Sequence, residues 1–332
     1  MKPVGIIANP ASGKDIRRLV AYGSVFDNNE KVNIVRRVVL GLDAMGVKDI
    51  FFMPDYFGIG VRAMEDLNVA VKAHFLEMKI ENAPEDSARA AGILSQLGAA
   101  CIVTLGGDGT NRVVAKTCGA TPLLPISTGT NNVFPTMVEG TLAGMAAGVT
   151  ALNSSPRPEF IRQAPRLVLR HGTEIVDIAL IDVVVSKPGF IASRAIWDIA
   201  TLQEIFLCRA EPGSIGFSSV GGHMSHLSSA DGKGLHIIIG PGPYEVKAPI
   251  APGLIREVPV KSFRLFSPGE AIPLSHTPAM IALDGERERI EGKKNRVIIE
   301  IEVEGPWVVD IPRTLRYAAE QRLFLNPKQL RR

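Results

Sequence analysis

The sequence has few of the features that mark secreted, membrane-spanning or nucleic-acid-binding proteins. Its three cysteines, Cys101, Cys118 and Cys208, form neither a CxxC pair nor a cluster with zinc spacing. The net charge of +3 is too small to favour nucleic acid or an anionic membrane as partner. The first apolar run stops at Asn9-Pro10, too early for a signal peptide, and no apolar stretch is long enough to span a bilayer. We therefore expect a cytoplasmic protein with reduced thiols.

The length of 332 residues fits two domains, and the hydrophobic pattern changes once along the chain. In residues 1–155, short apolar runs alternate with segments of helical spacing. We predict strands at 3–8, 49–53, 74–80, 101–105 and 123–126, and helices at 32–45, at 85–97 and from Gly140 onward. Strands that alternate with helices predict an α/β domain with a mostly parallel sheet and helices on both faces.

The second half is richer in strands. The linker-like cluster from Ser154 to Pro158 precedes it. Gly- and Pro-rich turns separate strands predicted at 167–170, 174–185, 235–239, 262–266, 280–283 and 297–303. We predict a β-rich domain over 156–310, and a segment 311–332 with a helix at 315–324 that packs back on the N-terminal domain.

The loop Gly106-Gly107-Asp108-Gly109-Thr110 follows the predicted strand at 101–105 and precedes a helical segment. Glycines let backbone N–H groups approach a polyanion, and a helix start adds unpaired donors. A plain strand-to-helix turn is the alternative, but such a turn would not need Asp108 between glycines. A carboxylate there is unfavourable for a phosphate unless it holds magnesium or takes a proton from an attacking hydroxyl. We predict a phosphate site in which Asp108 is catalytic.

Two further polar loops follow predicted strands. Asn9-Pro10-Ala11-Ser12-Gly13-Lys14 offers hydroxyl, backbone and ammonium groups, although its spacing is not that of a Walker A loop. Ser127-Thr128-Gly129-Thr130-Asn131-Asn132 offers hydroxyls and amides. Each alone fits an ordinary helix-start or capped loop. Three such loops at the ends of three strands favour one shared site, because ligands bind at that edge of an α/β sheet.

Asp284-Gly285-Glu286 lies in the β-rich half, and on its own it reads as a hairpin turn. Together with the three loops, however, it resembles the superfamily of NAD kinases and of diacylglycerol and sphingosine lipid kinases. The GGDGT motif is the most specific mark of that superfamily. The segments 9–14 and 129–132 are similar to the first loop and the Gly-Thr-Gly-Asn segment of lipid kinases, and the late Asp-Gly motif occurs in both branches.

Other segments are similar to NAD kinases. Ile181-Asp182 looks like the NAD kinase Asn-Glu pair that grips the substrate ribose, with the carboxylate kept and the amide lost. Gly213-Ser214-Ile215-Gly216-Phe217 is similar to a Gly-Ser-Thr-Ala-Tyr segment. Residues 194–198 are similar to a narrower subfamily of predicted ATP-NAD kinases that includes the acetoin catabolism protein X, where we place the chain. Ile181 and Ile215 depart from the NAD kinase pattern and leave the acceptor open.

The resemblance implies a NAD kinase-like two-domain fold, with a Rossmann-like N-terminal domain, a sandwich-like C-terminal domain and a site in the cleft between them. It implies a homo-oligomeric kinase that uses ATP or polyphosphate and Mg²⁺ to convert NAD to NADP. Magnesium would bind through Asp108 or Asp284, and either Asp108 or the Asp284-Glu286 motif would supply the base. The predicted phosphate-binding residues are Asn9, Ser12, Gly13, Lys14, Gly106, Gly107, Gly109, Thr110, Thr128, Gly129, Thr130 and Asn131, and the predicted acceptor-binding residues are Asn132, Asp182, Ser214, Asp284 and Glu286.

Several alternatives stay open. The acceptor could be another small hydroxylated or keto metabolite, or, least favoured, a lipid. The chain could also be a nucleotide-sensing binder without turnover. Gly58-Ile59-Gly60-Val61-Arg62-Ala63 fits a GxGxxA dinucleotide fingerprint with Glu77 or Glu81 as its acidic residue, which would indicate a dehydrogenase. Residues 54–57 separate those glycines from the preceding strand, which counts against that reading.

Overall fold

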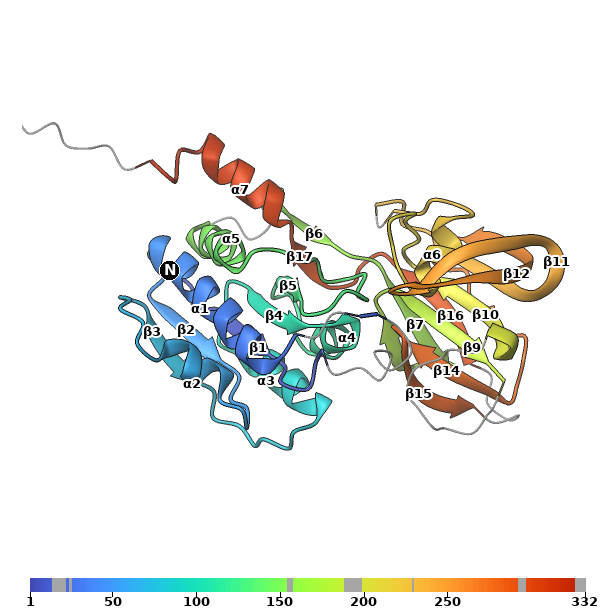
Figure 1. The fold of residues 1–332 in the computed structure, drawn as a ribbon, viewed down its shortest axis with the longest axis horizontal. Helices are drawn as coiled ribbons and strands as arrows, with labels where there is room; N and C mark the ends of the chain where they lie inside the picture. The colour runs from blue at the N-terminus through green and yellow to red at the C-terminus, as the bar shows by residue number, and fades with distance from the viewer. Residues whose placement is uncertain are drawn as a thin grey trace, which may run out of the picture.

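The computed structural model describes residues 1–13, 22–23, 26–153, 158–187, 199–228, 230–291 and 297–325. Its two parts, an α/β part and a β-rich part, lie side by side (Figure 1). Three sheets build them: one of seven strands in the first part, and one of six and one of four strands in the second. The predicted fold class, an α/β N-terminal domain followed by a β-rich one, is confirmed.

The seven-stranded sheet has the order β3-β2-β1-β4-β5-β17-β6. The first five strands are parallel, as predicted. The strand order reverses between β1 and β4, and such a switch point is where open α/β sheets bind ligands. The strands are β1 Val4–Ala8, β2 Asp49–Phe52, β3 Lys72–Phe75, β4 Ile102–Gly106, β5 Leu123–Ser127, β6 Ile161–Gln163 and β17 Trp307–Val309.

Helices cover both faces of this sheet, because neighbouring strand residues point to opposite sides. Ile6 belongs to a core with α1 and α5, whereas Ile7 belongs to a core with α3 and α4. None of the helices in the described ranges is long and apolar enough to cross a membrane. The helices of this part are α1 Asn28–Ala44, α2 Ile59–Met64, α3 Pro84–Gln96, α4 Asp108–Ala115, α5 Gly140–Leu152 and α7 Ile311–Glu320.

Local signals set the helix ends. Asp27 caps α1 by accepting the N–H of Glu30 at 2.8 Å. The helix predicted at 315–324 begins earlier, at Ile311, because Asp310 caps it by accepting the N–H of Arg313 at 3.0 Å. This last helix, α7, lies against α5 (Figure 1).

The β-rich part is a sandwich of a six-stranded sheet, β12-β11-β10-β9-β14-β15, and a four-stranded sheet, β13-β16-β7-β8. Side chains from both sheets share one core, such as Leu167 on β7 and Val183 on β9. A short helix, α6 Phe217–Gly222, packs on the outer face of the larger sheet. The strands are β7 Arg166–His171, β8 Glu174–Ala179, β9 Asp182–Ser186, β10 Leu202–Leu207, β11 Gly234–Ala251, β12 Leu254–Phe266, β13 Ile272–Pro273, β14 Ala279–Leu283, β15 Glu286–Glu291 and β16 Val297–Glu302.

Two predicted strands differ from the structure. The strand expected at 174–185 is two strands, β8 and β9, which belong to different sheets. The chain crosses between the sheets at Leu180 and Ile181, whose N–H groups donate to the Asp284 carboxylate. The strand expected at 74–80 is displaced to Lys72–Phe75.

The glycines of the dinucleotide-like fingerprint serve helix packing. β2 ends at Phe52, and α2 begins only at Ile59. A Cβ atom on Gly60 would come within 2.9 Å of the Phe52 ring, so this glycine lets α2 lie close to the sheet. The fingerprint therefore lacks the strand-end turn that a dinucleotide site needs.

Glu204 on β10 is buried in the sandwich and ties three segments together. Its carboxylate accepts hydrogen bonds from Nε2 of His236 at 3.0 Å, the N–H of Ser275 at 2.8 Å and Nδ1 of His276 at 3.3 Å. Burial by itself would raise the pKa of Glu204, but these donors outweigh burial and hold the pKa below its ordinary value.

We predict that Glu204→Gln weakens the protein and changes its response to acid. A carboxyl whose pKa is lower in the folded state stabilises the fold above its unfolded pKa, and this contribution is lost as the pH falls through the folded pKa. The variant should lose about 1–3 kcal/mol of unfolding free energy at neutral pH. Urea unfolding at several pH values should show a shallower loss of stability on acidification than in the wild type. The exposed Glu245→Gln should behave as the wild type, and an unchanged acid slope in Glu204→Gln would contradict the argument.

Candidate active site

Asp108 lies at the point where β4 meets α4. It is the first residue of α4, so it sits among the unpaired N–H groups and the positive end of that helix. Its carboxylate accepts the N–H of Val133 at 3.1 Å and that of Phe134 at 2.7 Å. Asp108 therefore fixes the loop after β5 against the GGDGT loop.

The glycines of the GGDGT loop sit where side chains would collide. A Cβ atom on Gly106 would come within 2.5 Å of the Thr110 side chain, and one on Gly107 within 2.8 Å of the Asn132 amide oxygen. A Cβ atom on Gly109 would come within 2.6 Å of the Glu286 carboxylate. The loop is thus packed between the loop after β5 and the turn between β14 and β15.

Direct hydrogen bonds join the three polar loops. Nδ2 of Asn9 donates to Oγ1 of Thr110 at 2.9 Å, and the hydroxyls of Ser12 and Thr128 are 3.1 Å apart. The first loop therefore touches both others, beside the switch point between β1 and β4. Gly13 ends the described part of this loop with a φ of 76°, and Lys14 lies outside the described residues.

Lys31 binds the backbone of the first loop through its ammonium group, although the sequence analysis did not single it out. It lies on α1 with 0% of its surface exposed. Its ammonium group donates to the carbonyl oxygens of Asn9 at 2.9 Å and Ser12 at 2.6 Å, and to Oδ1 of Asn28 at 3.1 Å. A lysine next to the buried apolar stripe of α1 was the available signal, because a buried ammonium group needs oxygen partners.

The loop after β5 holds itself together through Asn132. Nδ2 of Asn132 donates to the Ser127 hydroxyl at 2.8 Å, and this hydroxyl donates to the Gly129 carbonyl at 2.7 Å. The side chain of Asn132, a predicted acceptor-binding residue, therefore stabilises its own loop. Its neighbour Asn131 lines the cleft described below, and Thr130 is half-buried beside it.

Asp284 lies in the turn between β14 and β15 and binds the chain where it passes from β8 to β9. With 3% of its surface exposed, it accepts the N–H groups of Leu180 at 3.0 Å, Ile181 at 2.8 Å and Asp182 at 3.2 Å. Burial raises the pKa of Asp284 to about 8, and the nearby Asp182 carboxylate adds to the rise, whereas Arg112 and the backbone donors oppose it. A carboxyl with such a pKa exchanges its proton near neutral pH.

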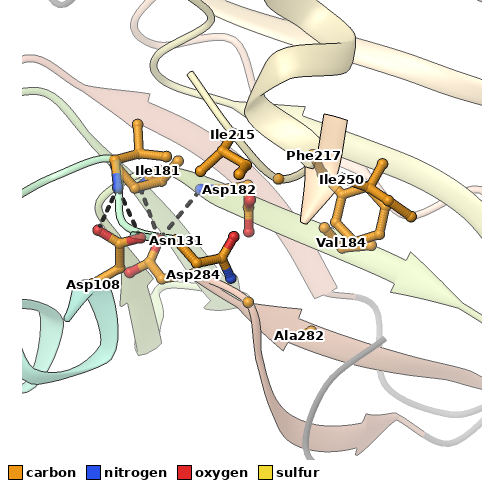
Figure 2. Close-up of a pocket in the computed structure, with 13 residues that line it drawn as sticks. Asp108, Asn131, Ile181, Asp182, Val184, Ile215, Phe217, Ile250, Ala282 and Asp284 are labelled. Atoms are coloured by element: carbon orange, nitrogen blue, oxygen red, sulfur yellow. Dashed lines mark hydrogen bonds between the residues drawn. The ribbon is translucent and has the colours of Figure 1, made fainter. Parts of the chain in front are cut away.

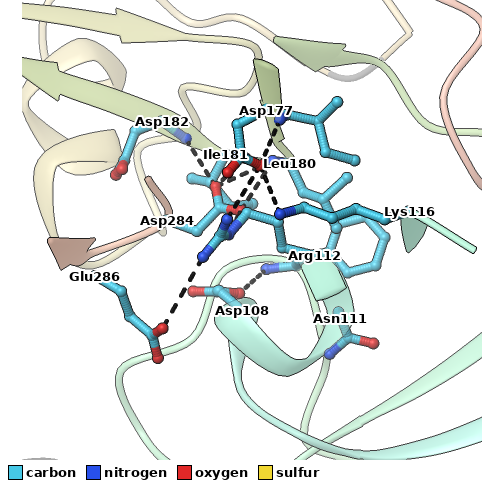
Figure 3. A network of polar contacts seen from close by, with 12 residues as sticks. Asp108, Asn111, Arg112, Lys116, Asp177, Leu180, Ile181, Asp182, Asp284 and Glu286 are labelled. Atoms are coloured by element: carbon cyan, nitrogen blue, oxygen red, sulfur yellow. Dashed lines mark hydrogen bonds and ion pairs between the residues drawn. The ribbon is translucent and has the colours of Figure 1, made fainter. Parts of the chain in front are cut away.

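Arg112 joins the α/β part to the β-rich part, and the sequence analysis missed it as well. Only 1% of its surface is exposed. It extends from α4 to Asp177 on β8 at 3.3 Å, to Asp284 at 3.7 Å and to Glu286 at 4.0 Å (Figure 3). Lys116 on the same helix contacts Asp177 at 2.7 Å. The helix that carries Asp108 is therefore anchored to the β-rich part through buried charges. A cation one turn after the GGDGT motif was the only sequence signal.

A cleft of about 550 Å³, counted together with the open solvent at its mouth, lies between the two parts (Figure 2). It brings together Asp108 and Asn131 from the first part with Asp182 and Asp284 from the second. Ser214 and Glu286, both predicted acceptor residues, are not among its lining residues. Apart from those four polar residues, the lining consists of Val133, Ile181, Val184, Ile215, Gly216, Phe217, Ile250, Ala282 and Gly285.

The described residues contain no group of three or more His, Cys, Asp and Glu side chains arranged to hold a metal ion by themselves. Magnesium is usually held by one or two carboxylates together with substrate phosphates and water, so such a protein-only cage is not required. Both oxygens of Asp108 and both oxygens of Asp284 accept backbone N–H groups. Asp108 fits this pattern better because it lies at the start of a helix, at the end of β4.

Comparisons with known proteins show the family of the chain. Residues 4–151 match the ATP-NAD kinase N-terminal domain family, so the part that carries Asp108 is a kinase-type domain. Residues 165–304 match the acetoin catabolism protein X C-terminal domain family. The acetoin catabolism protein X of Cupriavidus necator is 35% identical over 340 residues, covering 98% of this chain and 95% of that protein. The chain therefore belongs to the acetoin catabolism protein X family, and the N-terminal match supports a kinase-type function.

Two solved structures also resemble the chain. Yeast NADH kinase complexed with NADH gives a TM-score of 0.48 at 14% identity, covering 100% of this chain and 90% of that one. An NAD kinase from Archaeoglobus fulgidus in complex with ATP gives a TM-score of 0.39 at 12% identity, covering 98% and 100%.

We predict that Arg112→Gln strongly destabilises the protein. The substitution removes the buried cation beside the buried Asp284 carboxyl group, whereas Asp177 keeps Lys116 as a partner. Breaking a buried ion pair typically costs about 3–5 kcal/mol. Urea unfolding monitored by circular dichroism should measure the loss. Arg264→Gln, which removes an exposed pair with Glu270, is the matched control and should change little. Equal stability of the two variants would show that Arg112 does not anchor α4.

Proposed function

We propose that the chain is an ATP-dependent kinase that phosphorylates a hydroxyl group of a small molecule bound in the cleft. One observation carries this proposal. The Asp108 carboxylate stands at the start of α4, beside three hydrogen-bonded polar loops at the switch point, and it also lines the cleft with residues of the β-rich part. A phosphate on the loop side and a hydroxyl on the cleft side would therefore meet at this carboxylate.

The polar loops are suited to the triphosphate of the nucleotide. Backbone N–H groups at a helix start and in glycine loops bind phosphate oxygens, and the hydroxyls of Ser12, Thr110 and Thr128 lie at the same edge of the sheet. The other predicted phosphate-binding residues, such as Gly107 and Gly129, keep the loop surfaces free of side chains. Magnesium, bound with the phosphates and Asp108, would neutralise negative charge during transfer. Polyphosphate remains a second candidate donor.

In the proposed reaction, the acceptor oxygen forms a bond to the γ-phosphorus. The bond from that phosphorus to the oxygen bridging to the β-phosphate breaks, and ADP leaves with the electron pair. Asp108 receives or orients the hydroxyl proton. Asp284 is the second candidate for this role, because its raised pKa suits proton exchange. Asp182, in the cleft wall, would accept a hydrogen bond from the acceptor.

NAD was the acceptor predicted from the sequence, and the match of residues 4–151 to ATP-NAD kinases supports it. The match of residues 165–304 to acetoin catabolism protein X supports a small metabolite instead. A cytoplasmic homo-oligomer remains our expectation for the protein. Incubation with ATP, Mg²⁺ and each acceptor, followed by mass spectrometry of the products, tests the proposal. Tight ATP binding without ADP release for any acceptor would favour a nucleotide-sensing protein.

We predict that Asp108→Asn lowers kcat by about a hundred- to ten-thousand-fold, since it keeps the side-chain shape and removes the base. ADP release under saturating substrates measures the effect. Asp49→Asn is the matched control, because Asp49 begins β2 at the opposite edge of the sheet, and it should keep wild-type turnover. Circular dichroism should confirm that both variants fold. Wild-type turnover in Asp108→Asn would remove Asp108 from the mechanism.

A further inference from the structure

We infer that the acceptor is a compact alcohol that carries no negative charge, such as a vicinal diol or a hydroxyketone with an alkyl skeleton. This inference rests on the proposed function, because it concerns the molecule that the cleft presents to Asp108. It differs from the dinucleotide expectation, since NAD carries a pyrophosphate group. Three features of the cleft support it: its acidic lining, its apolar wall and the engaged backbone N–H groups of residues 180–182 in that wall.

The first feature is the acidic lining. The carboxyl groups of Asp108, Asp182 and Asp284 all line the cleft, and each is at least nine-tenths buried. The described lining residues include no lysine, arginine or histidine. Arg112 and Lys116 on α4 already contact acidic side chains. Carboxylates in a poorly solvated site repel an anionic ligand and accept hydrogen bonds from hydroxyls.

The second feature is the apolar wall. Seven of the thirteen lining residues are apolar and branched, aromatic or alanine. Ile181, Ile215 and Phe217 lie around the same space as Asp182 (Figure 2). Small-molecule sites commonly combine such a wall with a few polar groups that fix orientation. Here the wall would contact alkyl carbons while the carboxylates orient the hydroxyl groups.

The third feature is the state of the backbone at Ile181. Its N–H already donates to the Asp284 carboxylate at 2.8 Å, and its side chain has no polar atom. The N–H groups of Leu180 and Asp182 on either side face the same carboxylate. The backbone of residues 180–182 therefore offers no free N–H group to a phosphate or a nucleobase. The specificity for the acceptor then depends on the shape and apolar character of Ile181 and Ile215.

The first experiment compares acceptors. The full chain with ATP and Mg²⁺ would be given a four-carbon vicinal diol, a four-carbon hydroxyketone, glycerol and NAD, with ADP release and product mass as readouts. We expect kcat/KM for the best uncharged alcohol to exceed that for NAD by about 100-fold or more, because a site that leaves charged or polar groups unpaired discriminates strongly. Phosphorylation of NAD with the alcohols inert would overturn the inference and leave the kinase proposal standing.

The second experiment tests the wall. Ile215→Thr and Ile181→Asn add polar groups at similar size, and each should raise KM for the preferred alcohol by about 10- to 200-fold with kcat largely kept. A merely structural role would lower kcat and stability together instead. Ile255→Thr, on the exposed face of β12, is the matched control. Unchanged KM in both cleft variants would overturn the assignment.

Measuring the binding of the four compounds distinguishes a failure of this inference from a failure of the kinase proposal. If no acceptor releases ADP, ligand-detected NMR with the same four compounds still decides the acceptor class. Binding of an uncharged alcohol that Ile215→Thr weakens would support the inference without the kinase activity. Binding of NAD alone, or of none of the four compounds, would overturn it.

Discussion

The arrangement of the site depends on one buried carboxylate, that of Asp284. Three consecutive backbone N–H groups and Arg112 surround it, and these partners offset part of the free-energy cost of placing a carboxylate away from water. The backbone donors hold the crossing between the two sheets of the sandwich. Arg112 holds the helix that begins with Asp108. The relative position of Asp108 and the cleft wall therefore depends on the contacts of this one carboxylate.

The same principle recurs in the first polar loop and in the loop after β5. Asp108 fixes the loop after β5 by accepting two of its N–H groups, and Lys31 fixes the first loop by donating to its carbonyl oxygens. In each case a buried charge pairs with backbone groups that would otherwise lack partners. A frame of this kind holds reactive groups in place before substrate arrives, which is what phosphoryl transfer demands of a protein.

The sequence predicted the parallel strands and most helices well, because hydrophobic spacing, caps and glycines act over a few residues. It failed where distant pairing outweighed local pattern. The run 174–185 reads as one apolar strand, yet the chain changes sheets in its middle. β11 continues well past the strand predicted at 235–239, through a Gly- and Pro-rich stretch that reads as a turn, since β12 pairs with it beyond a register shift.

What the sequence determined by itself is the presence of three polar loops at the ends of buried strands, with a carboxylate among glycines in one of them. These are local properties, set by periodicity and backbone freedom. Only the tertiary structure decided what surrounds that carboxylate. Ile181 and Asp284 are 103 positions apart, and Asn9 and Thr110 are 101 apart. Roles such as those of Lys31 and Arg112 arise from such contacts, because the cost of a buried charge depends on partners that only folding brings near.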